Sequence, residues 1–397
     1  MAQLSDRLNR LAPSATLAMS QKSNEMKAQG VDVINMSVGE PDFNTPDHIK
    51  EAGKKAIDDN FSKYSPVPGY MDLREAIVDK LKKENHLDYT TGEVIVGTGG
   101  KQGVCNTILA LVNPGDEVII PAPYWVSYPQ MAKLAGATPV IVRAGFEQDF
   151  KMTAEQLEAA ITPKTKMLIF CSPSNPTGSV YSQEELNALA QVILKHEDIF
   201  VLSDEIYEHI NYVGKAASIA SYPGMKERTI ICNGVSKAYA MTGWRLGWVA
   251  APAWIVKGIN KLQGQYTSGT CDVSQKAAVA AYVASQDCVE QMRVAFERRR
   301  DLIVKLAKDI PGLEVNVPQG AFYLFPKCSS FFGKSDGETV INNSTDFAMY
   351  ILEKAHVATV GGDAFGDPDC FRMSYATSDD NIREAMRRIK EVLAVLK

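Results

Sequence analysis

The chain has 397 residues, 45% hydrophobic and 22% charged, as in a globular protein with room for a large buried core. Its formal net charge is -5, from 42 basic and 47 acidic residues, which disfavours a polyanion partner such as nucleic acid. The longest basic run, Arg298 to Arg300, is expected on a solvated helix face.

Short runs rich in valine and isoleucine recur through the central two thirds of the chain, largely without polar alternation. They predict seven strands, at residues 93–97, 117–120, 139–142, 167–170, 199–203, 229–232 and 247–250. Runs of this kind are typical of strands buried on both faces, as in a parallel sheet covered by helices. Several intervening segments, for example 102–112 and 182–196, are long enough for crossover helices. The predicted fold class is therefore α/β with a mostly parallel sheet.

The C-terminal third has a different pattern. Residues 274 to 310 predict a nearly unbroken helix, with at most a kink near Ser285. Short strands at 313–317 and 322–325, a surface loop at 331–345 and a terminal helix at 379–396 follow. We expect a smaller α+β domain that the N-terminal segment completes. The predicted boundaries are 48–290 for the large domain, and 1–47 together with 291–397 for the small one.

Cysteine, histidine and hydropathy patterns point to a cytoplasmic protein. The seven cysteines are scattered without a C-x-x-C pair, which favours reduced thiols, and the five histidines lack ligand spacing, so no metal is expected. The polar segment 1–10 lacks the apolar core of a signal peptide. No apolar run approaches the roughly 20 residues that span a bilayer, so no membrane partner is expected.

One segment points to a cofactor. Lys237 is followed eight residues later by Arg245, with small residues and glycines between them. A lysine amine can form a Schiff base with an aldehyde, and a planar guanidinium suits a phosphate. Together they meet the two needs of pyridoxal phosphate.

Two further segments follow predicted strands and supply polar groups. Residues 97–102 contain Gly99 and Gly100 and open a helix, whose N-terminal N–H groups can face an anion; an ordinary glycine turn is the alternative. Residues 172–178 form a rigid loop around Asn175, at a strand edge where ligands bind in open α/β sheets; the alternative is a plain turn.

Two more segments supply charged groups. In residues 203–207, Asp204 could pair with a protonated pyridine nitrogen, and Tyr207 could bond the ring phenolate; alternatively Asp204 is a helix N-cap. Arg372 lies in an apolar, strand-like context, and its guanidinium could bind a substrate carboxylate through two parallel hydrogen bonds. The alternative for Arg372 is an internal salt bridge.

Taken together, these motifs resemble the class I pyridoxal-phosphate aminotransferases, over nearly the whole chain from Pro13 to Arg372. Residues 38–43, 65–69 and 123–129 strengthen the likeness, which is greatest to the bacterial aspartate aminotransferase branch. The resemblance implies the type I fold of pyridoxal-phosphate transferases. It also implies a homodimer with shared active sites.

The resemblance assigns a role to each matching position. Lys237 is the Schiff-base lysine and proton shuttle, and Asp204 is the partner of the pyridine nitrogen. The other groups implied at the cofactor are Tyr207 and Asn175 at the ring oxygen, Trp125 stacked on the ring, and, around the phosphate, Arg245, Ser236 and the backbone of Gly99, Gly100 and Lys101. Tyr64 is implied to reach the phosphate of the neighbouring subunit.

Substrate contacts follow from the same resemblance. Arg372 anchors the α-carboxylate, and the remaining contacts implied are Gly39, Trp125, Asn175, Lys101 and Thr16. Two positions depart from the family. Gly234 stands where a serine often touches the phosphate, and residues 266–270 lack the arginine that reads the distal carboxylate in animal-type enzymes. Lys101 is expected to take over that second task.

The implied activity moves an amino group between an L-amino acid, expected to be aspartate, and 2-oxoglutarate by a ping-pong mechanism. Prephenate or aromatic amino acids are alternative substrates, and a β-lyase with the same cofactor is an alternative reaction. A cofactor-sensing regulator would need a DNA-binding domain, for which the chain leaves no room. A nicotinamide-dependent dehydrogenase is disfavoured because G-x-G-x-x-G does not follow the first strand.

Overall fold

The structure, a computed structural model, describes residues 4–397, so Met1–Gln3 of the predicted small domain lie outside it. Its largest sheet has seven strands in the order β2-β8-β7-β6-β5-β3-β4. Only β8 runs antiparallel to its neighbours, β2 and β7. The strands are β2 Val94–Gly97, β3 Glu117–Ala122, β4 Thr138–Arg143, β5 Thr165–Cys171, β6 Phe200–Asp204, β7 Thr229–Gly234 and β8 Gly247–Ala250. All seven predicted strands and the α/β class are confirmed.

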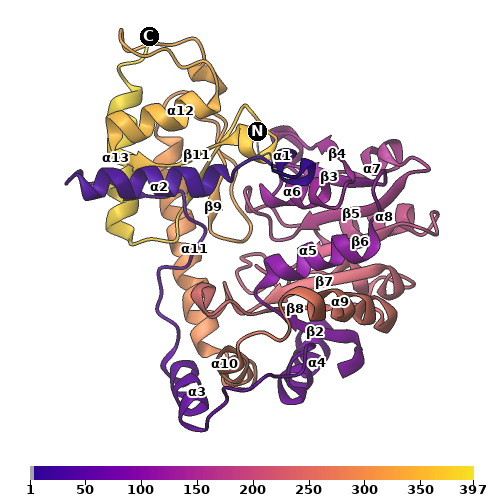
Figure 1. The fold of residues 1–397 in the computed structure, drawn as a ribbon. Helices are drawn as coiled ribbons and strands as arrows, with labels where there is room; N and C mark the ends of the chain where they lie inside the picture. The colour runs from indigo at the N-terminus through magenta and orange to yellow at the C-terminus, as the bar shows by residue number, and fades with distance from the viewer. Residues whose placement is uncertain (1–3) are drawn as a thin grey trace.

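Both faces of this sheet are buried, which explains its apolar, non-alternating strands. In β3, Val118 and Ile120 pack into one hydrophobic cluster with residues of α5, whereas Ile119 between them packs into another with residues of α7 and α8. Figure 1 shows helices on either side of the strands. The helices of this part are α3 Asp47–Asp58, α4 Met71–Asn85, α5 Gly100–Leu111, α6 Ser127–Leu134, α7 Ala154–Ala160, α8 Gln183–Ile193, α9 Ala253–Tyr266 and α10 Asp272–Val283.

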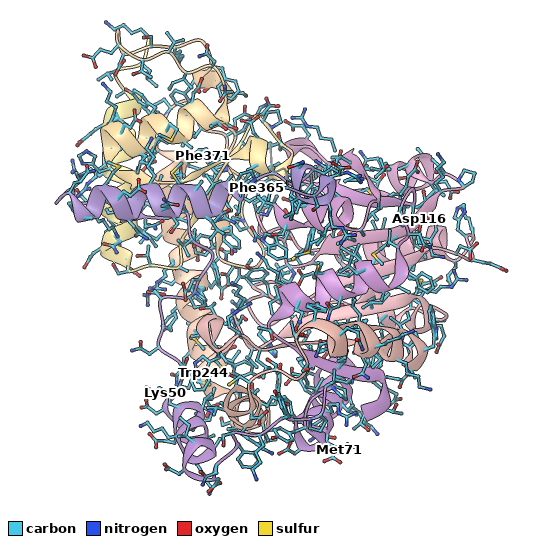
Figure 2. The ribbon with its side chains drawn as sticks, in the orientation of Figure 1. Lys50, Met71, Asp116, Trp244, Phe365 and Phe371 are labelled. Atoms are coloured by element: carbon cyan, nitrogen blue, oxygen red, sulfur yellow. The ribbon has the colours of Figure 1, made fainter. Side chains whose placement is uncertain are left out.

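The C-terminal elements form a second group, at the upper left of Figure 1. A three-stranded sheet has the order β11-β12-β9 (Val360–Gly361, Phe371–Ser374 and Tyr323–Leu324). Around it lie α11 Asp287–Lys308, α12 Ser344–Tyr350 and α13 Asp379–Leu393. Phe371, labelled in Figure 2, packs against Phe347 of α12 with ring centroids 4.8 Å apart.

The N-terminal segment touches both groups of elements. Helix α1 (Asp6–Asn9) lies beside α6, and the backbone of Ala12 donates to Gln130 Oε1 at 3.0 Å. Helix α2 (Ala15–Ala28) and strand β1 (Ile34–Asn35) lie with the C-terminal elements, where β1 pairs in parallel with β10 (Val357–Ala358). The domain boundaries at 47/48 and 290/291 stay a prediction. Among the described residues, no helix is long and apolar enough to cross a membrane.

Three sequence-based expectations for local structure were wrong. The helix predicted over 274–310 is two helices, because Ala284 is extended (ψ 175°) and the Gln286 side chain donates to the carbonyls of Ala281 and Ala284. The strand at 313–317 is absent, because there only Glu314 forms a bridge, with Lys327. The following strand shortens to Tyr323–Leu324.

The basic run is also not simply solvated. Arg299 is buried and donates to both carboxylate oxygens of Asp42, at 2.7 and 2.9 Å. Arg298 binds Asp379. The run therefore ties α11 to the N-terminal segment and to α13.

A buried ion pair joins α4 to the segment that follows β6. Lys80 is 4% exposed and donates to Glu208, which also accepts from Asn85 at 2.8 Å and Asn233 at 2.6 Å. Burial alone would raise the pKa of Glu208, but the Lys80 ammonium and these hydrogen bonds outweigh it and lower the pKa to about 2. The pair thus connects α4 to the residues next to Tyr207.

Replacing Lys80 by methionine should destabilise the protein by about 3–5 kcal/mol, because Glu208 would stay buried without its cation. Urea unfolding at pH 7 measures this loss. Lys82→Met, at an exposed lysine of the same helix, is the control and should change the free energy of unfolding by less than about 0.5 kcal/mol. A loss below about 1 kcal/mol for Lys80→Met would contradict the assignment.

Candidate active site

A cavity of about 330 Å³ opens at the carboxyl ends of β5, β6 and β7, where Cys171, Asp204 and Ser236 contribute to its wall. Ligands of open α/β folds bind at this edge of the sheet, and the volume suits a small molecule. The cavity brings together all the predicted site residues except Gly99 and Tyr64. Those that line it are Thr16, Gly39, Gly100, Lys101, Trp125, Asn175, Asp204, Tyr207, Ser236, Lys237, Arg245 and Arg372.

Lys237 supplies an amine in the middle of the cavity. Its Nζ donates to the Gly39 carbonyl at 2.6 Å and lies 5.8 Å from the Tyr207 ring centroid. Burial, reinforced by the Arg372 and Arg245 cations, lowers the pKa of Lys237 to about 8 against the opposing pull of nearby carboxylates. About a tenth of the amine is therefore neutral, and nucleophilic, at pH 7.

Asp204 ends β6 and is buried beneath the cavity. One carboxylate oxygen accepts from the Tyr128 hydroxyl at 2.6 Å, and the other accepts from the Ile206 N–H at 3.3 Å. Burial raises the pKa of Asp204 to about 6, although these two hydrogen bonds and the Lys237 charge oppose the shift. Turns, not an α-helix, follow it, so the N-cap alternative is wrong. At neutral pH Asp204 is an anion suited to a cationic N–H.

Arg245 supplies a cation at the other side of Lys237. Its guanidinium donates to the carbonyls of Thr242 at 2.8 Å and Thr98 at 3.4 Å, and it has no carboxylate partner within residues 4–397. Gly99 has φ +80°, and a Cβ there would lie 2.4 Å from Arg245 Nη2, so only glycine allows this approach. Helix α5 begins next to it at Gly100, with N–H groups available for an anion.

The loop that carries Arg245 is anchored by the neighbouring Trp244, labelled in Figure 2 near α3 and α10. The Trp244 indole N–H donates to the Thr45 hydroxyl at 3.1 Å, and the backbone carbonyl of Trp244 accepts from the Ser274 hydroxyl at 2.8 Å. The departure at Gly234 also has a steric reason. A Cβ there would lie 2.7 Å from the Gly247 Cα in the adjacent strand, so the serine of the family pattern has no room.

Arg372 supplies a second cation, from β12. It is 2% exposed, donates to Asn175 Oδ1 at 2.9 Å and to the Ser37 carbonyl, and stacks 4.7 Å from the Tyr323 ring centroid. Its Nε has no partner and its guanidinium no carboxylate among the described residues, so the internal salt-bridge alternative is wrong. A buried guanidinium in this state suits a bidentate carboxylate ligand.

Lys101 and Thr16 line the more open side of the cavity. Lys101 Nζ lies 4.9 Å from the Trp125 ring centroid and has no carboxylate partner in the described part of the chain. Partial burial and the Arg245 charge lower the pKa of Lys101. Thr16 comes from the start of α2, so the N-terminal segment covers this side. Both residues line the cavity.

Some residues of the cavity were not predicted. Tyr128 holds Asp204, and the Tyr323 hydroxyl lies 2.7 Å from that of Tyr207. Tyr128 lies in the segment 123–129 and Tyr323 in the predicted strand 322–325. The only sequence feature that could have indicated either as a site residue is a tyrosine hydroxyl among apolar neighbours. The other unpredicted lining residues are Ser14, Leu17, Val38, Val126, Ser127, Cys171, Ile206 and Thr242.

Tyr64 lies apart from this cavity. Its side chain is 102% exposed and borders a separate groove, formed by residues 61–65 and 269–272. Residues 269–271 also border the surface depression next to Arg245. Tyr64 therefore makes no contribution to the cavity of its own chain.

Comparison with known proteins extends over the whole chain. A family model described as aminotransferase class I and II matches residues 31–389. The chain is 49% identical to an aspartate/prephenate aminotransferase of Cereibacter sphaeroides, with 100% of both covered. The aspartate aminotransferase structure from Rhizobium meliloti has TM-score 0.97 and 42% identity over 100% of both chains. That from Thermus thermophilus with maleate has TM-score 0.93 and 40% identity, covering 99% of this chain and 100% of the other. The predicted resemblance and fold are confirmed.

The raised pKa of Asp204 has a consequence for stability. Because its folded-state pKa of about 6 exceeds the ordinary 3.8, the penalty for ionisation is absent below pH 3.8 and complete above about pH 6. Asp204→Asn should therefore stabilise the cofactor-free protein at pH 7, by roughly 3 kcal/mol at most, and have little effect at pH 4. Urea unfolding at both pH values measures the difference. Exposed Asp198→Asn is the control, and destabilisation at pH 7 by Asp204→Asn would refute the assignment.

Proposed function

Since the chain belongs to the class I and II aminotransferases, we propose that it transfers the amino group of L-aspartate to 2-oxoglutarate, with pyridoxal phosphate bound in the cavity. One observation carries the proposal: Arg372 is a buried arginine without a carboxylate partner among the described residues, and it lines the same cavity as Lys237 and Asp204. Such an arginine suits the α-carboxylate that amino and 2-oxo acids share.

The groups around the cavity fit pyridoxal phosphate, on which class I aminotransferases generally depend. An amine, a buried carboxylate and a cation beside a helix N-terminus match an aldehyde, a protonated pyridine nitrogen and a phosphate. Lys237 would hold the aldehyde carbon and Asp204 the ring nitrogen. The other residues proposed to hold the cofactor are Arg245, Ser236 and the backbone of Gly99, Gly100 and Lys101 at the phosphate, Tyr207 and Asn175 at the ring oxygen, and Trp125 at the ring face.

When bound, this cofactor supplies an electron sink that makes the Cα proton of an amino acid acidic. Arg372 holds the substrate carboxylate and thereby orients the Cα–H bond, a positioning effect. The Lys237 amine would take the proton from Cα as a general base and, as a general acid, deliver it to the carbon of the cofactor that carried the aldehyde, not back to Cα. The Tyr128 hydrogen bond helps to keep Asp204 ionised, and so able to hold a proton on its partner.

Lys101 and Thr16 support a dicarboxylate substrate. An ammonium group without a carboxylate partner in the described chain suits a distal carboxylate. Prephenate, a 2-oxo acid with two carboxylates, is a candidate amino acceptor in place of 2-oxoglutarate, because the Cereibacter sphaeroides relative is named for both aspartate and prephenate. Both residues line the cavity, as either substrate requires.

We also propose a cytoplasmic homodimer with shared sites. Tyr64 is fully exposed beside residues 269–272, of which 269–271 also border the depression next to Arg245. In a dimer joined along this surface, Tyr64 would reach the phosphate in the partner's cavity. Sedimentation analysis tests the assembly, and a monomer at micromolar concentration would exclude it.

Lys237→Ala should abolish covalent attachment of the cofactor and lower the rate of amino-group transfer from aspartate by at least about 100-fold, because the general acid–base group is lost. Borohydride reduction of the loaded wild type, digestion and peptide mass measurement should place the label at Lys237. Exposed Lys257→Ala is the control and should retain both properties. A label on another residue would overturn the proposal.

Lys101→Met should lower kcat/KM for aspartate by about 10- to 100-fold, the value of a charge-assisted hydrogen bond. The values for phenylalanine and alanine, which lack a distal carboxylate, should stay within a factor of two and serve as the internal control. Comparing prephenate with 2-oxoglutarate as the amino acceptor, with aspartate as the donor, decides between the two candidate acceptors. Equal losses for all substrates would remove Lys101 from the distal site, and ammonia release without an oxo-acid acceptor would favour the β-lyase reaction.

A further inference from the structure

Two buried tyrosines meet at the wall of the cavity. The hydroxyls of Tyr207 and Tyr323 lie 2.7 Å apart, and the side chains are only 3% and 0% exposed. Tyr207 follows β6 in the large sheet, whereas Tyr323 lies in β9 of the three-stranded sheet. The pair therefore links the two sheets at the cavity, and the chemistry proposed above gives Tyr323 no task.

The arrangement of protons in this pair is constrained. Burial raises the pKa of Tyr323 to about 12 and that of Tyr207 well above its usual range, so each hydroxyl keeps its single proton near neutral pH. In the hydrogen bond between them, one hydroxyl donates and the other accepts. When Tyr207 donates to an acceptor in the cavity, only Tyr323 can supply the proton of the bond that joins the pair.

The surroundings of Tyr323 restrict the hydrogen bonds that its hydroxyl can form. Tyr207 is its hydrogen-bond partner within residues 4–397, and a Cβ at Gly39 would lie 2.2 Å from the Tyr323 oxygen. Glycine at position 39 thus leaves space for this hydroxyl. The same Gly39 accepts from Lys237 through its carbonyl at 2.6 Å.

The ring of Tyr323 makes a second contact. The Arg372 guanidinium carbon lies 4.7 Å from its centroid, close enough for a cation–π interaction. One side chain therefore touches the arginine proposed for the substrate and the tyrosine proposed for the cofactor. The two contacts use different parts of Tyr323, which makes them separable by substitution.

We propose that Tyr323 is a positioning residue with two roles. Its hydroxyl donates to Tyr207 and so leaves the Tyr207 proton free for the ring oxygen of the cofactor, while its ring fixes the plane of Arg372 for the substrate carboxylate. The inference rests on the proposed function, since it assigns the acceptor in the cavity to pyridoxal phosphate.

A double-mutant cycle tests the hydroxyl role without measuring activity. Apoprotein is titrated with pyridoxal phosphate, and tryptophan fluorescence reports binding. Tyr323→Phe should weaken binding by about 3- to 10-fold, the value of one hydrogen bond. In a Tyr207→Phe background the same change should have almost no effect, because its target is gone. Equal weakening in both backgrounds, or no weakening in the wild type, would overturn the proposal.

Substrate kinetics test the ring role. Tyr323→Phe keeps the ring and should leave the KM for aspartate within about twofold, whereas Tyr323→Leu should raise it by about 10-fold, in the range of a desolvated cation–π contact. Equal KM values for the two variants would overturn this role. Tyr375→Phe removes a hydroxyl from another fully buried tyrosine, outside the cavity lining, and should leave cofactor affinity unchanged.

The outcomes separate the two proposals. If wild-type protein fails to bind pyridoxal phosphate at Lys237, the proposed function fails. If wild-type protein binds it and the cycle shows no coupling between Tyr207 and Tyr323, only the inference about Tyr323 fails. Thermal melting of each apoprotein checks that the variants are folded, and the phenylalanine variants retain the buried ring that the fold requires.

Discussion

Charged groups in the wall of the cavity are kept from neutralising one another. Arg372 is buried with an amide and a carbonyl as partners, and Arg245 binds only carbonyls. Asp204 receives hydrogen bonds from a tyrosine and a backbone N–H. Burying a charged group without a partner of opposite charge costs free energy, and a ligand that supplies this partner offsets the cost. The cavity therefore favours a charged ligand. The proposed binding of pyridoxal phosphate and of an anionic substrate would depend on this separation.

The rest of the fold holds these groups apart. Asp204 ends β6, and Lys237 follows the neighbouring strand β7, in a sheet buried on both faces, so packing on both sides holds their backbones in place. Arg372 belongs to a different sheet, and α11 ties the segment that contains Gly39 to the C-terminal elements through Arg299. On the side of α4, the Lys80–Glu208 pair supports the turn that carries Tyr207. Lys80 and Glu208, buried charges outside the cavity, thus form an ion pair, whereas Arg245 and Arg372 in the cavity have no carboxylate partner among the described residues.

Much of the site could be predicted because its residues lie in local motifs. Lys237 and Arg245 lie in one segment. The glycines at the start of α5 indicate that the backbone there comes close to another group. The structure adds why the pattern departs at Gly234, where Gly247 of the adjacent strand leaves no space for a side chain. Tyr128 and Tyr323 were missed because their partners are 76 and 116 residues away in sequence. The break at residues 284–286 was missed because side-chain hydrogen bonds of Gln286, not a proline or glycine, end the helix there.

The sequence by itself determined the seven strands of the large sheet, the class of the fold and most of the charged groups in the cavity, because apolar runs, turn residues and short motifs act over a few neighbouring positions. Only the tertiary structure decided which charges find partners. Arg299 and Arg372 are both buried, yet Arg299 is paired with Asp42, whereas Arg372 has no carboxylate partner among the described residues. That difference depends on where distant segments pack, since a salt bridge requires two groups within about 4 Å of each other, whatever their separation along the chain.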